Sequence, residues 1–156
     1  MPPQLRAATP ADLETVLAWL PDSQACQLWA GPAVRFPTTA ADLWHDIGAT
    51  GQNTFIFSSS AEGSLVGFGQ LLLRPGGVAH LARLIISPQH RGQGLGRHLC
   101  LALLHEGATF LGASTFTLRV YPDNKAAVAL YGSLGFAEVP DAGDESGSIL
   151  MRAVVG

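Results

Sequence analysis

The sequence has little charge and few cysteines. Charged residues make up 13% of its 156 residues and the formal net charge is −3, which argues against a nucleic-acid-binding surface. Cys26 and Cys100 are the only cysteines, too few for a disulfide framework and typical of a reducing compartment. No apolar run reaches the roughly 18 residues of a membrane span. Residues 1–14 lack the basic and apolar regions of a secretory signal. We therefore expect a cytoplasmic protein with no nucleic-acid or membrane partner.

The sequence also shows no metal-ligand motif, no internal repeat and no linker segment. Its five histidines and two cysteines show no recognised ligand pattern, so we expect no metal. Hydrophobic residues make up 47% of the sequence, which is an ordinary to somewhat apolar globular composition. The length suits one domain, and we predict a single domain over residues 1–156.

Hydrophobic periodicity predicts a mixed α/β fold. Thr9, Pro10 and Asp12 have the spacing of a helix start, and residues 21–37 are predicted to form an irregular loop. The predicted helices cover residues 10–20, 38–50, 94–108 and 124–134. The predicted strands cover residues 3–8, 53–60, 65–75, 78–86, 115–120, 136–139 and 148–155. The sheet is expected to combine antiparallel hairpins with one parallel pair in its middle.

Three glycines occupy one strand-to-helix corner in the stretch SPQHRGQGLGRHL, residues 87–99. Glycine at a helix start costs about 1 kcal/mol against alanine, so three of them need a reason. Bare amides at the positive end of a helix dipole can wrap a phosphate, and Arg91 and Arg97 flank the corner. A tight turn that needs positive φ is the alternative. The pattern favours a pyrophosphate cradle.

Two common phosphate motifs are excluded at this corner. No Lys-Ser/Thr pair follows Gly96, as a P-loop requires, and the dinucleotide spacing Gly-x-Gly-x-x-Gly fails from both Gly92 and Gly94. What matches is Arg91-x-x-Gly94-x-Gly96, which resembles the acyl-CoA signature of the GNAT superfamily of N-acetyltransferases. A second block, VYPDNKAAVALYGSLGF, resembles the family's Asn-x-x-Ala-x-x-x-Tyr-x-x-x-Gly-Phe stretch.

The resemblance implies a fold and a cofactor site. The fold would be the acyl-CoA N-acyltransferase fold, a mostly antiparallel sheet splayed at a parallel pair and flanked by about four helices. Acetyl-CoA would be the acyl donor, with pantetheine along one bulged strand and pyrophosphate on the amides after it. The implied binding residues are Ile85, Ile86, Arg91, Gly92, Gln93, Gly94, Leu95, Gly96, Arg97 and Asn124. Asn124 could instead serve only as a helix cap.

The resemblance also implies catalytic residues. Tyr131 would protonate the leaving thiolate, unless its hydroxyl is only a satisfied polar tip of the core. Some family members carry a glutamate base where this chain has Arg119, so that assignment fails here. His80 is the candidate base because an imidazole has an ordinary pKa of about 6.5, although it could be a plain strand histidine. Asp46 and Glu106 are further options without a motif.

Residues on the acceptor side carry the weakest signals. Trp29 and Phe36, with Trp44, fall in the segment that by resemblance roofs the acceptor cleft, and core packing is the alternative for each. The acidic turn of Asp141, Asp144 and Glu145 could border that cleft or be a solvated loop. Cys100 is expected in the core, on the apolar helix after the glycine corner, and Cys26 lies in the predicted loop before Trp29. A cysteine acyl-enzyme has no His/Asp arrangement to support it.

The sequence therefore predicts an N-acetyltransferase that moves an acetyl group from acetyl-CoA to a primary amine by direct attack in a ternary complex. The acceptor could be a small molecule or a protein amine, and the chain a monomer or homodimer. A non-catalytic acyl-CoA-binding or sensor domain of the same fold is the alternative.

Overall fold

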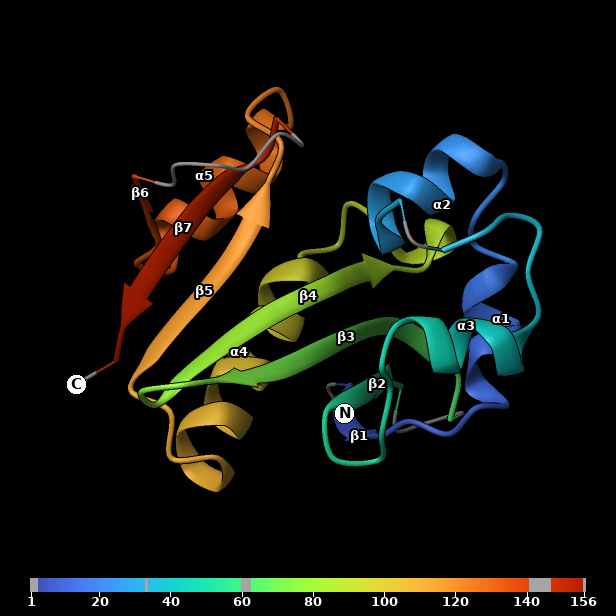
Figure 1. The fold of residues 1–156 in the computed structure, drawn as a ribbon, viewed down its shortest axis with the longest axis horizontal. Coiled ribbons are helices and arrows are strands. Elements are labelled where there is room, and N and C mark those ends of the chain that lie inside the picture. The colour runs from blue at the N-terminus through green and yellow to red at the C-terminus, as the bar shows by residue number, and fades with distance from the viewer. Residues whose placement is uncertain (1–2, 33, 60–62, 141–146, 156) are drawn as a thin grey trace. The chain divides into compact units, whose positions relative to one another are not determined.

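The computed structural model describes residues 3–32, 34–59, 63–140 and 147–155. In chain order its elements are β1 (Gln4–Ala7), α1 (Asp12–Leu17), α2 (Ser23–Ala30), α3 (Ala40–Asp46), β2 (Thr54–Ser58), β3 (Leu65–Arg74), β4 (Val78–Ile86), a 3₁₀ turn η1 (Pro88–His90), α4 (Leu95–Phe110), β5 (Thr115–Val120), α5 (Lys125–Ser133), β6 (Ala137–Val139) and β7 (Ile149–Val154) (Figure 1). The mixed α/β class is thereby confirmed.

The strands form one sheet in the order β1-β2-β3-β4-β5-β7-β6. The pairs β1–β2, β2–β3, β5–β7 and β6–β7 are antiparallel, and β4–β5 is parallel. A parallel pair needs a crossover, and α4 supplies it between β4 and β5. The expected parallel pair in a mainly antiparallel sheet is therefore confirmed.

The chain divides into two compact units. The first holds residues 1–70 and 83–102, and the second holds residues 71–82 and 103–156. We call them the N-unit and the C-unit. Strands β3 and β4 and helix α4 each contribute residues to both.

The N-unit has its own apolar core beneath helices α1, α2 and α3. The most deeply buried side chains of this cluster come from three helices and two strands: Leu13, Val16, Cys26, Leu43, Ile56 and Phe68 are all at 0% exposure. Trp29 and Ile85 pack against this cluster while half-buried. The apolar spacing of the helices thus buries one stripe of each, as an amphipathic helix requires.

The C-unit is built on the β5–β7 ladder, which pairs Thr115 to Val120 with Val154 to Ile149. Phe116, Leu118 and Met151 are buried there. Gly107 of α4 lies so close to Phe116 that an added Cβ would stand 2.5 Å from the ring. A glycine is therefore required where this helix crosses the strand.

Helix α2 corrects the sequence analysis, which expected an irregular loop over residues 21–37. Asp22 caps this helix, since its Oδ1 accepts a hydrogen bond of 2.8 Å from the amide of Ala25. Pro21 ends the preceding segment, and the cap restarts a helix at once. The described residues thus hold five α-helices rather than about four.

The start of α1 also differs from expectation. The helix begins at Asp12, and Thr9 makes no side-chain cap. The Asp12 carboxylate instead accepts bonds from the Thr9 amide at 2.8 Å and from its hydroxyl at 3.1 Å. It also forms a bidentate pair with Arg6 at 2.9 Å. The acidic half of the predicted capping box is present, and its pairing with Arg6 and Thr9 holds the pKa of Asp12 below its ordinary value.

Candidate active site

The glycine corner joins β4 to α4 in the N-unit. Gly92 and Gly94 have φ of +79° and +77°, and an added Cβ at either would meet nothing within 4 Å. Their need for glycine therefore comes from backbone conformation. Gly96 differs because it is the second residue of α4, where glycine lowers helix stability. Of the three glycines, Gly96 is therefore the one whose presence the backbone conformation explains least, and a bound ligand could explain it.

Side-chain and backbone bonds hold this corner to the strand that precedes it. Arg91 Nε donates to the carbonyl oxygen of Ile86 at 3.1 Å. The amide of the buried Ser87 donates to Val66 at 2.9 Å, and His90 donates back to Ser87 at 2.9 Å. Residues Arg91 to Gly94 and Arg97 are exposed. The corner thus presents a fixed backbone and two cationic side chains to solvent at a helix N-terminus, which is chemistry suited to an anion.

Strand β4 changes character along its length. Its parallel register with β5 runs from Val78 to Leu81. Arg83 then adopts φ of +54°, a left-handed conformation that residues with a Cβ rarely use. A left-handed residue of this kind re-aims a strand, and we call this point of β4, at Arg83, the β4 bulge.

Ile85 and Ile86, the predicted pantetheine strand, follow that bulge. Gly67 of β3 lies against them, since an added Cβ there would stand 3.0 Å from Ile86 Cδ1 and 3.3 Å from the Ile85 carbonyl oxygen. The sequence analysis did not single out Gly67. Its signal was a glycine inside a strand pattern, which can mark close backbone approach.

Trp29, a predicted acceptor contact, is bonded to the bulge. Its Nε1 donates to the carbonyl oxygen of Arg83 at 2.8 Å, and its ring meets Phe68 edge-on at 5.5 Å between centroids. Phe36, the other predicted contact, has 36% exposure in the segment between α2 and α3. Trp44 is half-buried against the core. An acceptor role for Trp29 and Phe36 stays a prediction.

The predicted catalytic residues belong to the C-unit. His80 and Thr117 are partners in the β4–β5 register, and His80 Nδ1 lies 2.8 Å from Thr117 Oγ1. That contact fixes the orientation of the imidazole ring. The tautomer of His80 decides whether Nδ1 donates the hydrogen bond or accepts it. Arg119 occupies the position where some family members carry a glutamate base. Its side chain is exposed and donates to Ser148 Oγ at 3.4 Å.

Asn124 and Tyr131 both belong to the α5 segment. Asn124 is the N-cap of α5, with its Oδ1 accepting from the Ala127 amide at 3.2 Å. The capping role is therefore real, and cofactor contact remains a prediction. Tyr131 is half-buried and meets Phe136 edge-on at 6.2 Å between ring centroids. Phe136 is 3% exposed, so it anchors one side of the tyrosine ring.

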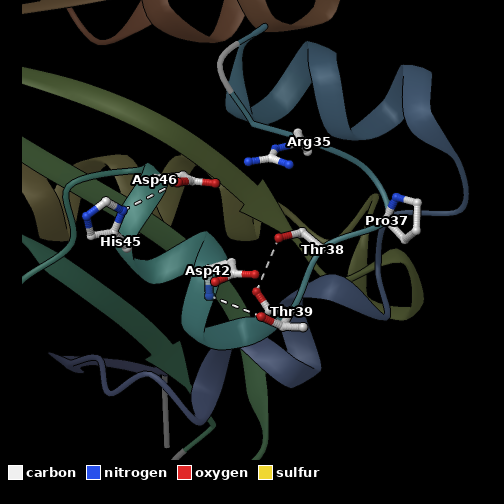
Figure 2. Close-up of a pocket in the computed structure, with 7 residues that line it drawn as sticks. All are labelled: Arg35, Pro37, Thr38, Thr39, Asp42, His45 and Asp46. Carbon is white, nitrogen blue, oxygen red and sulfur yellow. Dashed lines mark hydrogen bonds and ion pairs between the residues drawn. The ribbon is translucent and has the colours of Figure 1, made fainter.

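A pocket of about 550 Å³ opens within the N-unit between α3 and the segment after α2 (Figure 2). Asp42 and Asp46 face it from α3, and Arg35 lies across from them. Thr39 caps α3 by accepting from the Asp42 amide at 3.1 Å. Asp46, one of the optional bases, lies 3.5 Å from His45 Nδ1. This recess has mixed charge and contains none of the predicted cofactor residues.

The remaining candidates add no further chemistry. Cys26 and Cys100 are buried free thiols, and burial raises the pKa of Cys26 and raises that of Cys100 to about 12. Glu106 is half-buried on α4. The acidic turn of residues 141, 144 and 145 lies outside the described residues. Within the described chain no cluster of His, Cys, Asp or Glu could hold a metal, and no described helix is long and apolar enough to cross a bilayer.

Solved structures share the fold over nearly the whole chain. The spermidine N-acetyltransferase of Vibrio cholerae, solved with CoA and spermine, superposes with a TM-score of 0.78 at 22% identity, covering 97% of this chain and 95% of that one. A putative phosphinothricin N-acetyltransferase gives 0.73 at 22% identity, covering 99% of both chains. At these identities the likeness is one of fold.

Curated relatives match over shorter stretches. The ribosomal protein bS18-alanine N-acetyltransferase of Escherichia coli K12 is 43% identical over 60 residues, which cover 38% of this chain and 40% of that protein. The mycothiol acetyltransferase of Kytococcus sedentarius is 36% identical over 81 residues, covering 52% and 27%. These alignments span less than half the length of either relative.

The sequence profile of the "Acetyltransferase (GNAT) family" matches residues 16–136. That range includes helix α2, the bulge at Arg83, the glycine corner and the α5 segment with Asn124 and Tyr131. The chain therefore belongs to the acetyltransferase (GNAT) family.

Proposed function

We propose that this protein transfers an acetyl group from acetyl-CoA to a primary amine by direct attack in a ternary complex. The observation that carries the proposal is the glycine corner of a GNAT family member. There, Gly92 and Gly94 turn the backbone with positive φ, and Arg91 ties the corner to Ile86 at the head of a 16-residue helix. Such a helix start attracts a pyrophosphate.

The binding part of the proposal assigns roles to backbone. The amides of Gln93 to Arg97 hold the pyrophosphate, with Arg91 and Arg97 adding charge. The backbone of Ile85 and Ile86 supports the pantetheine arm. Asn124 contributes there in addition to its cap. This use of main chain explains why plain aliphatic side chains suffice at Ile85 and Ile86.

The chemical part assigns roles to side chains. The amine nitrogen attacks the thioester carbon, the C–N bond forms and the C–S bond breaks. His80, or a water that it orients, accepts the proton of the amine. The Tyr131 hydroxyl donates a proton to the departing thiolate, because a phenol carries an O–H donor that can serve as a general acid. Each role is a prediction from the family motif and the residue's chemistry.

Direct attack is preferred to an acyl-cysteine route for a physical reason. Only a thiolate is a strong nucleophile. Both thiols are buried with raised pKa values, that of Cys100 reaching about 12. A thiol of that kind is protonated near neutral pH, so two free cysteines in a reducing, cytoplasmic setting fit a packing role better than a covalent one.

The proposal is tested by two measurements on the wild-type protein. Isothermal titration with CoA tests the cradle. Thiol release from acetyl-CoA, with a panel of amines and mass spectrometry of the products, tests transfer. The panel contains spermidine, spermine, a peptide that begins with alanine, and free amino acids, because the names of similar proteins mention polyamines and a protein alanine. Binding of CoA without transfer to any amine favours the sensor alternative, and absence of binding overturns the proposal.

A further inference from the structure

The bulge of β4 is held by three side chains of the N-unit. Trp29 Nε1 donates to the Arg83 carbonyl oxygen at 2.8 Å. In the other direction, Arg83 Nε donates to the carbonyl oxygen of Ala30 at 3.1 Å. Two neighbouring residues of α2 and one strand residue are thus bonded reciprocally, over more than fifty positions of sequence. The last turn of α2 and the bulge are fixed to each other.

Gln70 extends this contact to the other side of the guanidinium. Arg83 Nη1 donates to Gln70 Oε1 at 2.8 Å. The fully buried Gln70 uses its own amide to donate to the carbonyl oxygen of Ile47 at 3.2 Å and to Thr54 Oγ1 at 3.1 Å. The bulge is therefore also bonded, through one side chain, to the end of α3 and the start of β2.

The Arg83 side chain is an unusual choice for this place. It is half-buried, its bonds go to neutral carbonyl oxygens, and within the described residues it has no carboxylate partner. Burial lowers the pKa of Arg83. Its backbone is also left-handed, where glycine or asparagine would be easier. An arginine at such a strained position is explained if its planar guanidinium must donate in two directions at once, here to Ala30 and Gln70.

We propose that Trp29 and Arg83, supported by Gln70, are positioning residues that set the β4 bulge for acetyl transfer. The inference rests on the proposed function, in which the strand just after the bulge supports the donor. This positioning role is separate from the acceptor contact predicted for Trp29, and Arg83 and Gln70 are assigned no contact with substrate. Their role is to fix the conformation at Arg83, and so the direction of Ile85 and Ile86. Small misplacements of reacting groups cost rate steeply, up to about 10²-fold for 1 Å.

The test begins with Trp29→Phe, which removes the donor and keeps an aromatic ring against Phe68. We expect kcat with the best amine of the panel to fall about 10-fold, the rate equivalent of one hydrogen bond. The Kd of CoA should rise no more than about two- to fivefold, because the pyrophosphate contacts of the glycine corner remain while the pantetheine strand shifts. Amide hydrogen exchange of the unliganded protein should accelerate in the peptide that covers residues 83–86.

Trp19→Phe is the matched control. Trp19 belongs to the same core cluster at 9% exposure, and no described side chain or carbonyl is bonded to its indole. This variant should lose thermal stability while keeping kcat and the exchange rate of the bulge. If Trp29→Phe behaves like Trp19→Phe, with lower stability and unchanged kcat at a temperature where both are folded, Trp29 is merely structural and the inference is overturned.

Arg83→Asn provides the second arm. Asparagine tolerates the left-handed conformation but lacks the fork, so we again expect about a 10-fold loss of kcat. The double variant Trp29→Phe/Arg83→Asn should lose little more than either single variant, because both act on one bulge. Additive losses of kcat would contradict a shared role at one bulge.

If the wild type binds CoA but acetylates no amine, the proposed function fails. Two measurements then test the positioning role without any acetyl transfer: amide hydrogen exchange of residues 83–86 in the two variants, and the ratio of their affinities for acetyl-CoA and CoA. Both quantities should change if these residues fix the conformation of β4, and unchanged values would overturn the inference.

Discussion

The two compact units of this protein offer different kinds of groups to the proposed reaction. In the N-unit the candidate groups are main-chain atoms: the amides of the glycine corner and the backbone of Ile85 and Ile86. Arg91 and Arg97 add charge at that corner, and the side chains of Arg91 and Arg83 bond to carbonyl oxygens of the fold. In the C-unit the candidates are titratable side chains, His80 and Tyr131, each on a regular element.

This difference separates binding from proton transfer. Backbone groups cannot be titrated near neutral pH, but a fold can aim them rigidly at an anion or a carbonyl. Imidazole and phenol can exchange protons, and a strand or helix fixes their position. Variants in the N-unit should therefore change affinity or positioning with pH profiles intact. Variants at His80 or Tyr131 should change turnover while CoA affinity is kept.

Tyr131→Phe should show the largest effect. It removes one hydroxyl and keeps the ring that packs on Phe136, so the fold and CoA affinity should persist. Turnover should fall by about 10- to 10³-fold, the range of a positioned acid. Steady-state kinetics and titration with CoA are the measurements. Tyr121→Phe, at the chain's other tyrosine, is the control and should turn over normally. A Tyr131→Phe enzyme as fast as wild type would assign the proton to water or substrate, and a collapse of stability would make the hydroxyl structural.

His80→Ala should come next, with a rate loss of about 10²-fold. An imidazole that serves as the base makes kcat/KM fall in acid, because its protonated form cannot accept the amine's proton. The alanine variant should lose that acidic limb. Thr117→Val, which removes the hydroxyl 2.8 Å from Nδ1, should lower the rate less and keep the limb. A pH profile of unchanged shape in His80→Ala, with a small rate change, would return His80 to a plain strand residue.

Much of the fold was predictable from local signals. The apolar alternation of residues 78–86 and 115–120 gave strands with the observed bounds. The glycine corner marked the start of α4 to within a residue. Helix α2 was missed because its stretch follows a proline and carries mixed residues, and its cap at Asp22 was the overlooked signal.

The candidate site was less predictable, for a physical reason. Motif residues such as Gly94, Asn124 and Tyr131 could be named because their spacing is local. The contacts of Trp29 with Arg83, and of Gly67 with Ile85, join residues far apart in sequence. One sequence shows an arginine in a strand, and nothing in its pattern reveals a left-handed φ or an indole donor. Tertiary contacts of this kind need coordinates.

Gly96→Val should weaken CoA binding by at least about 10-fold, since 1.4 kcal/mol is one decade of affinity. The smaller substitution Gly96→Ala is more informative, because it should raise the stability of the free protein while lowering its affinity for CoA. Alanine in the first turn of α4 should raise the stability of the free protein by up to about 1 kcal/mol. Its Cβ should at the same time weaken CoA binding. Titration calorimetry and thermal unfolding measure both. Raised stability with unchanged affinity would mean that no ligand approaches this amide.

Gly67→Ala should give the smallest effect. Its Cβ would stand 3.0 Å from Ile86 Cδ1 and 3.3 Å from both the Ile85 carbonyl oxygen and Phe57 Cβ. Ile86 can rotate its terminal methyl, but the carbonyl moves only with strand β4. Overpacking of this kind costs about 1–3 kcal/mol, and we place this single methyl at the low end.

The displaced strand is the one assigned to pantetheine, so Gly67→Ala should also raise the Kd of CoA about two- to fivefold. Gly51→Ala is the control in the same unit, since nothing lies within 4 Å of its added Cβ and its φ is not positive. That variant should bind CoA as wild type does. A Gly67→Ala protein with lowered stability and unaltered CoA affinity would show that β3 can shift alone, and that the path of Ile85 and Ile86 is set from the α2 side, by Trp29 and Arg83.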